Sequence, residues 1–262
     1  MSQPAVLTSL DRRGVATVTL NRPEVNNAYD ETLIQGLHAA MDDLGSKPAL
    51  RVVVLRGAGK HFQAGADLKW IRSVAAQDAR ENERVSRATA LAVHRLNNLP
   101  VPTVALVQGG CFGGGTGIVA ACDVVIAADN AMFSIAETRW GLTAAIILPQ
   151  LADAIGARQV RRYALSGERF GAEEARRIGL AHEVVPLAEL EAAGERLAAQ
   201  LLQNAPEANA QTKAAALELA VGSVDEATLS RLIAQHAAKR RSAEATEGLA
   251  SFVEKRPARW QP

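Results

Sequence analysis

The sequence lacks several features that mark specialised classes of protein. Cys111 and Cys122 are its only cysteines and form no C-x-x-C pair, which excludes a disulfide framework and indicates reduced thiols. The formal net charge of +1 gives no strong field for nucleic acid or a membrane surface. The apolar stretch 117–128 is interrupted by Asp123 and is too short to cross a bilayer. We therefore expect neither nucleic acid nor a membrane as a partner.

Several catalytic and targeting motifs are absent as well. Residues 1–5 show no basic patch followed by an apolar run, so we expect no signal peptide and a cytoplasmic location. The five histidines are scattered without the spacing of metal ligands, so we read them as structural or surface residues and expect no metal site. No serine lies in a G-x-S-x-G motif, which argues against a hydrolase triad.

The composition is that of an ordinary globular protein, with 48% hydrophobic and 22% charged residues. Apolar patterns and turn residues predict strands that alternate with helices, which is typical of an α/β core. The predicted strands are 15–20, 51–56, 103–107, 124–127 and 183–185. The predicted helices are 30–44, 67–74, 78–98, a short helix that follows the glycine turn and runs through 121, 157–166 and 171–179. After about residue 187 only alanine-rich helical sequence follows. We expect a core at 1–195 and a helical region at 196–262.

Two glycine-containing turns, at 61–68 and 113–117, each precede a predicted helix. The first N–H groups of a helix have no intrahelical partner, so two such turns that face one point can form an oxyanion hole. The second turn lacks the Gly-Lys-Ser/Thr ending of a phosphate loop. The acid expected after a dinucleotide fingerprint, Asp129, comes too early for a helix of normal length. The turns therefore favour an oxyanion over a nucleotide cofactor.

Glu137 is the candidate acid/base downstream of the second turn. Most glutamates are solvated, but this one stands between an apolar run at 131–136 and Trp140. A carboxyl group buried in such surroundings would have a raised pKa and could exchange protons near neutral pH. Two N–H donors and one such acid describe an enzyme that stabilises an enolate.

These motifs resemble the crotonase (enoyl-CoA hydratase/isomerase) superfamily. The resemblance covers nearly the whole chain in order and is carried by 21–23, 27–28, 60–68, 108–117, Cys122-Asp123, 133–137, 166–167, 173–175 and 179–181. It implies an α/β spiral of ββα units, a C-terminal helical trimerisation region, and a homotrimer or dimer of trimers. It also implies an acyl-CoA thioester substrate, with coenzyme A as part of the substrate and no separate cofactor.

The same resemblance assigns individual residues. The N–H groups of Ala66 and Gly114 match the family's oxyanion hole, and Glu137 matches one of its two catalytic glutamates. The substrate-binding positions implied in this way are Lys60, Ala64, Ala66, Asp67, Leu68, Lys69, Gly114 and Gly117.

One position departs from the family pattern. The hydratases with two glutamates carry the first of them three residues after the oxyanion glycine, where this chain has Gly117. Three functions stay open. The protein is a hydratase in which another group or Glu137 alone positions water, or a 3-enoyl-CoA to 2-enoyl-CoA isomerase with one base. The third alternative is a non-catalytic acyl-CoA-binding protein. The segments 137–142 and 158–168 resemble bacterial glutaconyl-type CoA hydratases that tolerate glycine here, which favours the hydratase.

Overall fold

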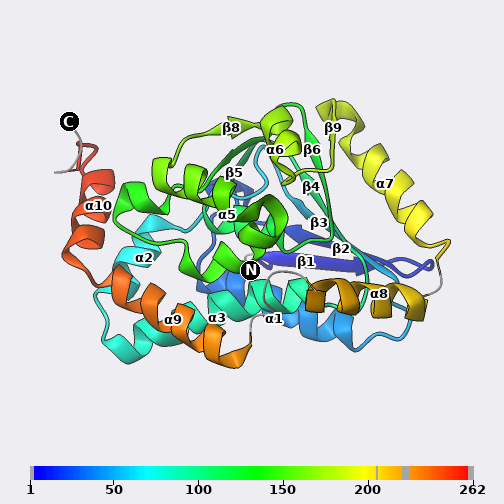
Figure 1. Cartoon of the computed structure of the whole chain (residues 1–262), viewed down its shortest axis with the longest axis horizontal. Coiled ribbons are helices and arrows are strands. Elements are labelled where there is room, and N and C mark those ends of the chain that lie inside the picture. The colour runs from blue at the N-terminus through cyan, green and yellow to red at the C-terminus, as the bar shows by residue number, and fades with distance from the viewer. Residues whose placement is uncertain (1–2, 205, 220–224, 259–262) are drawn as a thin grey trace.

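The structure, a computed structural model, describes residues 3–204, 206–219 and 225–258. Residues 1–2 of the expected core and 259–262 of the expected helical region therefore lie outside the described residues. In the described part a large sheet is flanked by helices, with a smaller sheet packed at one end (Figure 1). This is the α/β architecture that the alternation of strands and helices predicts.

The large sheet has the strand order β1-β2-β3-β4-β6-β9. Its strands are β1 (Val6–Leu10), β2 (Val15–Leu20), β3 (Val52–Gly57), β4 (Thr103–Val107), β6 (Val124–Ala128) and β9 (Glu183–Val185). All neighbouring pairs are parallel except β1 with β2. Every residue of β4 is buried, as expected for a parallel strand covered on both faces.

The small sheet, β5-β7-β8, was not predicted from the sequence. Its strands are β5 (Gly110–Phe112), β7 (Met132–Ser134) and β8 (Phe170–Gly171). These strands of two or three residues show no alternation and contain no β-branched residue, unlike 183–185 with its two valines. Strand β1 also escaped the sequence analysis, because four of its five residues are exposed. Each of β4 and β6 is followed by a strand of the small sheet and then a helix, which is the expected ββα unit.

The helices of the core begin where the sequence provides caps. Asp30, Asp67 and Asp78 accept backbone hydrogen bonds from the first turns of α1, α2 and α3. The helices of this part are α1 (Glu31–Gly45), α2 (Leu68–Ala75), α3 (Ala79–Asn97), α4 (Gly114–Ala120), α5 (Leu148–Ser166) and α6 (Ala172–Ile178). Gly156, with φ of +72°, interrupts α5, so the predicted helix at 157–166 forms its second part.

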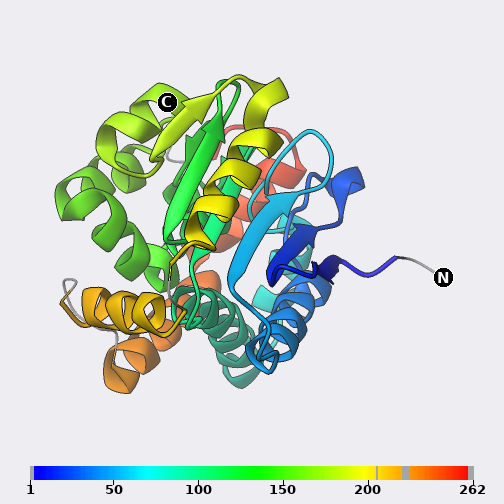
Figure 2. The same cartoon turned by 90° about the vertical axis from the view of Figure 1, so that its right-hand side faces the viewer.

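Four further α-helices follow β9 in the described part of the chain. They are α7 (Leu190–Leu201), α8 (Pro206–Leu219), α9 (Glu226–Arg240) and α10 (Ala243–Val253). Helix α7 lies across one face of the large sheet (Figure 2) and buries Leu190, Ala193 and Ala198 against it. The expected boundary at residue 195 falls inside this helix. Helix α9 packs on α3, and α10 packs on α2.

None of the helices in the described ranges is both long and apolar enough to cross a membrane.

Candidate active site

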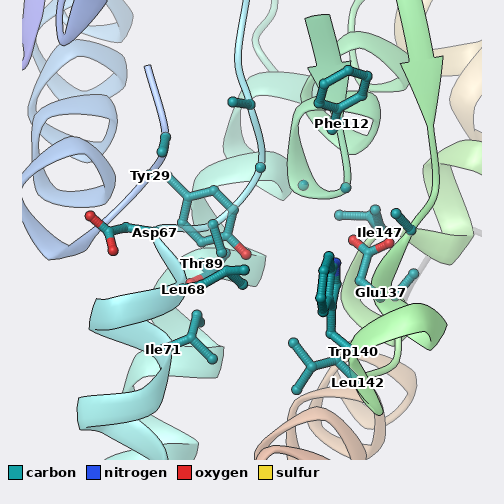
Figure 3. Close-up of a pocket in the computed structure, with 18 of the residues that line it drawn as sticks. Tyr29, Asp67, Leu68, Ile71, Thr89, Phe112, Glu137, Trp140, Leu142 and Ile147 are labelled. Atoms are coloured by element: carbon teal, nitrogen blue, oxygen red, sulfur yellow. The ribbon is translucent and has the colours of Figure 1, made fainter. Parts of the chain in front are cut away.

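A cavity of about 480 Å³ lies among the small sheet, the core helices and the C-terminal helices. Figure 3 shows part of its lining, with Tyr29, Glu137 and Trp140 directed into the space. The core contributes α1, the loop before α2, α3 and the turn before α4. The 3-10 helices η2 (Glu137–Trp140) and η3 (Ala145–Ile147) form another wall, and α9 and α10 supply His236, Arg240 and Phe252. The C-terminal helices thus line the cavity of their own chain.

The structure brings Ala66 and Gly114 together at this cavity. Within the described ranges, neither backbone N–H has a hydrogen-bond partner. Gly114 is the first residue of α4, where an N–H has no intrahelical acceptor. The N–H of the preceding residue, Gly113, is bonded to the Ser134 carbonyl at 2.8 Å. Two N–H groups are therefore available to a ligand oxygen.

Tyr29 connects the two sides of this arrangement. Its N–H donates to the Gly65 carbonyl, and its carbonyl accepts from the Asp67 N–H, each at 2.9 Å, which fixes the loop on both sides of Ala66. Its ring covers Gly114 so closely that a Cβ atom there would lie 2.6 Å from the Tyr29 Cε1 atom. Burial and the nearby charge of Glu137 raise the pKa of Tyr29, so its hydroxyl stays neutral. Nothing in the sequence analysis identified this residue.

Glu137 opens η2 and reaches the cavity. Its Oε2 atom is inaccessible to solvent and has no hydrogen-bond partner among the described residues. Burial raises the pKa of its carboxyl group to about 7 from the ordinary 4.5, and a backbone hydrogen bond opposes this only in part. A buried polar atom normally finds a partner, so the unpaired Oε2 can accept one from a water or a ligand. The expected buried carboxyl group is therefore present.

The other predicted substrate-binding residues divide into two groups. Ala64, Asp67, Leu68 and Lys69 line the cavity together with Ala66 and Gly114. Lys60 is exposed and lies outside the lining. Gly117 is buried and also lies outside it. Asp67 is committed to capping α2, because its Oδ1 accepts from the N–H groups of Lys69 and Trp70.

Helix α9 brings in two residues that the sequence analysis overlooked as site residues. His236 and Arg240 lie in the cavity lining and are buried. The Nδ1 atom of His236 is 2.9 Å from the Ser86 Oγ atom. This contact between α9 and α3 agrees with the structural role that we expect for the histidines. Leu229, Ile233 and Ala237 are buried at helical spacing, and Arg240 falls on the same face three residues later. That periodicity was the signal that could have found it.

Comparisons with known proteins show which family the chain resembles. The family model described as enoyl-CoA hydratase/isomerase matches residues 11–262. A hydroxycinnamoyl-CoA hydratase-lyase of Pseudomonas fluorescens is 39% identical over 74% of this chain and 71% of its own. A mitochondrial Delta(3,5)-Delta(2,4)-dienoyl-CoA isomerase of Dictyostelium discoideum is 30% identical over 94% of this chain and 87% of the isomerase.

A solved structure has the same fold throughout. The crystal structure of an enoyl-CoA hydratase from Mycobacterium avium subsp. paratuberculosis superposes with a TM-score of 0.86 at 30% identity, over 98% of this chain and 99% of the other. The crotonase fold expected from the sequence is confirmed.

Proposed function

The chain belongs to the enoyl-CoA hydratase/isomerase family and is an enzyme of the hydratase type, and we propose that it adds water across the 2,3 double bond of a 2-enoyl-CoA. The thioester oxygen would accept hydrogen bonds from the N–H groups of Ala66 and Gly114. Attack of water on the β-carbon then turns the thioester into an enolate whose charge these donors stabilise.

Glu137 serves as the acid/base in this proposal. In its protonated form one oxygen gives a proton to the α-carbon while the other accepts a proton from the attacking water. The carboxyl group ends in its starting state and one water has been added, so atoms and charge balance. The observation that carries the proposal is the orphaned Oε2 atom of Glu137, in a cavity that also holds two unpartnered N–H groups.

One carboxyl group has to suffice for both proton transfers. Among the described residues of the lining, Asp67 is the other carboxylate, and it caps α2. Gly117 has no side chain to orient water, and Ile147 fills the neighbouring space. These facts also support the second candidate, a 3-enoyl-CoA to 2-enoyl-CoA isomerase, which needs a single base. A non-catalytic acyl-CoA-binding protein would have no use for a buried, unpartnered carboxyl group.

The preferred acyl group in our proposal is a branched, glutaconyl-type chain. The resemblance of segments 137–142 and 158–168 to hydratases of such esters supports it. Ala64, Asp67, Leu68 and Lys69 would border the coenzyme A portion, with Lys69 exposed at the rim of the cavity. No cofactor beyond the coenzyme A of the substrate takes part in this reaction.

A panel of 2-enoyl-, 3-enoyl- and glutaconyl-CoA esters tests the proposal. The absorbance of the conjugated thioester follows the double bond, and the mass of the product shows whether water was gained. A hydratase lowers the absorbance of 2-enoyl or glutaconyl esters and adds one water. Conversion of a 3-enoyl ester into the conjugated isomer without any water uptake would replace the hydratase with the isomerase.

A further inference from the structure

Arg240 carries a guanidinium group that is buried in the wall of the cavity. It is the last residue of α9 and only 1% exposed. Its Nη2 atom donates to the Asn82 carbonyl and to the Ser86 hydroxyl, both on α3. Its Nε atom has no acceptor among the described residues. The hydrogen bonds that it makes therefore satisfy only part of a group with five donors.

The described residues provide no carboxylate partner for this charge. The buried groups that hold Arg240 are a backbone carbonyl and a hydroxyl, both neutral. His236, on the same helix, is neutral too, because burial and the Arg240 charge lower its pKa to about 3. The raised pKa of Glu137 comes from burial, with no contribution from Arg240, so Glu137 is not its counter-ion.

Burial lowers the pKa of Arg240 to about 10, which leaves it charged at neutral pH. A buried charge without a partner is costly and is retained where something else neutralises it. The cavity is where a ligand can do so, because Arg240 lines it together with Thr89 and His236.

We propose that Arg240 binds a carboxylate at the far end of the acyl chain, and so selects acyl-CoA esters of dicarboxylic acids. This rests on the proposed function, since the same cavity holds the thioester at Ala66 and Gly114. A planar guanidinium with an unused donor at Nε suits a carboxylate oxygen.

The phosphates of coenzyme A are a poorer fit for Arg240. Three other cations of the lining, Lys69, Arg139 and Arg169, are exposed, and they suit the solvated phosphates at the entrance. Arg240 is instead buried against α3, and the same cavity is lined by apolar side chains such as Val93 and Ile146. That position suits the end of an acyl chain.

Two esters of equal length separate charge recognition from chain length. Glutaconyl-CoA ends in a carboxylate, and 2-pentenoyl-CoA ends in a methyl group at the same place. We expect the wild type to have the higher kcat/KM for glutaconyl-CoA. Arg240→Met, which keeps the apolar stem, should lower the ratio of the two kcat/KM values by roughly 10–100-fold, as for loss of hydrogen bonds to a charged group. Arg240→Lys should retain part of the preference.

The matched control is Arg241→Met, the same substitution at the next residue, whose side chain is exposed. It should leave the ratio unchanged. A purely structural role of Arg240 at the contact of α3 and α9 would lower both kcat/KM values together and leave their ratio intact, and that result overturns the inference. A wild-type preference for 2-pentenoyl-CoA overturns it as well.

Saturated esters distinguish failure of this inference from failure of the proposed function. Glutaryl-CoA and pentanoyl-CoA cannot be hydrated, and their affinities can be measured by calorimetry. Tighter binding of glutaryl-CoA that Arg240→Met abolishes supports the carboxylate site even if neither unsaturated ester gains water. Equal affinity of the two saturated esters for the wild type refutes the site even if both unsaturated esters are hydrated.

Discussion

Gly117 and Ile147 are packed so closely that a Cβ atom on Gly117 would lie 2.2 Å from the Ile147 Cγ2 atom. Gly117 belongs to α4 and Ile147 to η3, so two separate segments meet at this point. In the resemblance to the two-glutamate hydratases, Gly117 is the place of the first glutamate. Here the space that its side chain needs is occupied by a buried isoleucine. Glycine at position 117 and the buried position of Ile147 therefore depend on each other, because the isoleucine occupies the space that a side chain at 117 would need.

Restoring the glutamate should not restore a two-glutamate site. We expect Gly117→Glu to lower stability by about 1–3 kcal/mol or more, because overpacking forces side chains and backbone to shift and a carboxylate is buried as well. Thermal unfolding measures the loss, and hydration should not accelerate. Adding Ile147→Ala to Gly117→Glu should recover part of the melting temperature. A Gly117→Glu protein as stable as the wild type would contradict the packing argument.

The pH profile should report Glu137. Its pKa of about 7 means that the protonated form, which donates to the α-carbon during hydration, is lost above neutral pH. We expect kcat/KM for hydration to fall as pH rises through about 7. We expect kcat/KM for dehydration to fall in the same way, because the same protonated carboxyl group starts the reaction in both directions. Glu137→Gln should remove the limb and lower kcat at least ~10²-fold. A hydration rate that instead rises through pH 7 would make Glu137 a base toward water.

The same group affects stability. Because the folded-state pKa lies above 4.5, its contribution is fully present below pH 4.5 and is lost as pH rises toward 7. The loss has a slope of at most about 1.4 kcal/mol per pH unit. Chemical unfolding at several pH values should show a flatter profile for Glu137→Gln, which also confirms that the variant is folded.

Two substitutions of Gly114 can distinguish the effect of losing its N–H donor from the effect of adding a side chain. Proline is well tolerated at the first position of a helix, which Gly114 occupies in α4. Both Gly114→Pro and Gly114→Ala add a Cβ atom against the Tyr29 ring, but only proline removes the N–H. Relative to Gly114→Ala, we expect Gly114→Pro to lose a further ~10²–10³-fold in kcat, as for one oxyanion donor. Equal rates of the two variants would remove Gly114 from the oxyanion hole.

Helix α10 holds the segment that carries Glu137. A Cβ atom on Gly248 would lie 2.1 Å from the Trp140 carbonyl oxygen, and Phe252 meets the Trp140 ring edge-on at 5.0 Å. Gly248→Ala should push α10 away from η2 and lower both the melting temperature and kcat. Gly45→Ala is the control, because nothing lies within 4 Å of its Cβ position in α1. Unchanged turnover in Gly248→Ala would show that Glu137 does not depend on α10.

The helical region after residue 195 should mediate assembly. Ala214, Ala215 and Ala216 of α8 are exposed in the single chain, although alanines favour burial. With the resemblance to a trimeric family, we expect three or six times the chain mass of 27.7 kDa. Light scattering at micromolar concentration measures it. A monomer would contradict the expectation.

The sequence by itself determined most of the core and much of the site. Strands β4 and β6 are recognisable as apolar runs, β3 contains the apolar run 52–55, and β2 is recognisable by its alternation. Helices α1, α2 and α3 begin at aspartates that cap them. Glu137 could be found because its apolar neighbours lie next to it in the chain. The turns that hold Ala66 and Gly114 could be found because each contains glycine and precedes a helix, and the resemblance to the crotonase family then assigned these two residues. In each case the physical signal is local.

Only the tertiary structure decided what comes from distant segments. Three such relationships join residues 30 or more positions apart in the chain. The Tyr29 ring covers Gly114, Ile147 packs against Gly117, and Arg240 lines the cavity together with residues of the core. No local pattern specifies which side chains fill such a space, because packing depends on how the strands and helices are arranged. The charge that α9 brings to the cavity, and with it the proposed choice of substrate, is therefore a property of the fold.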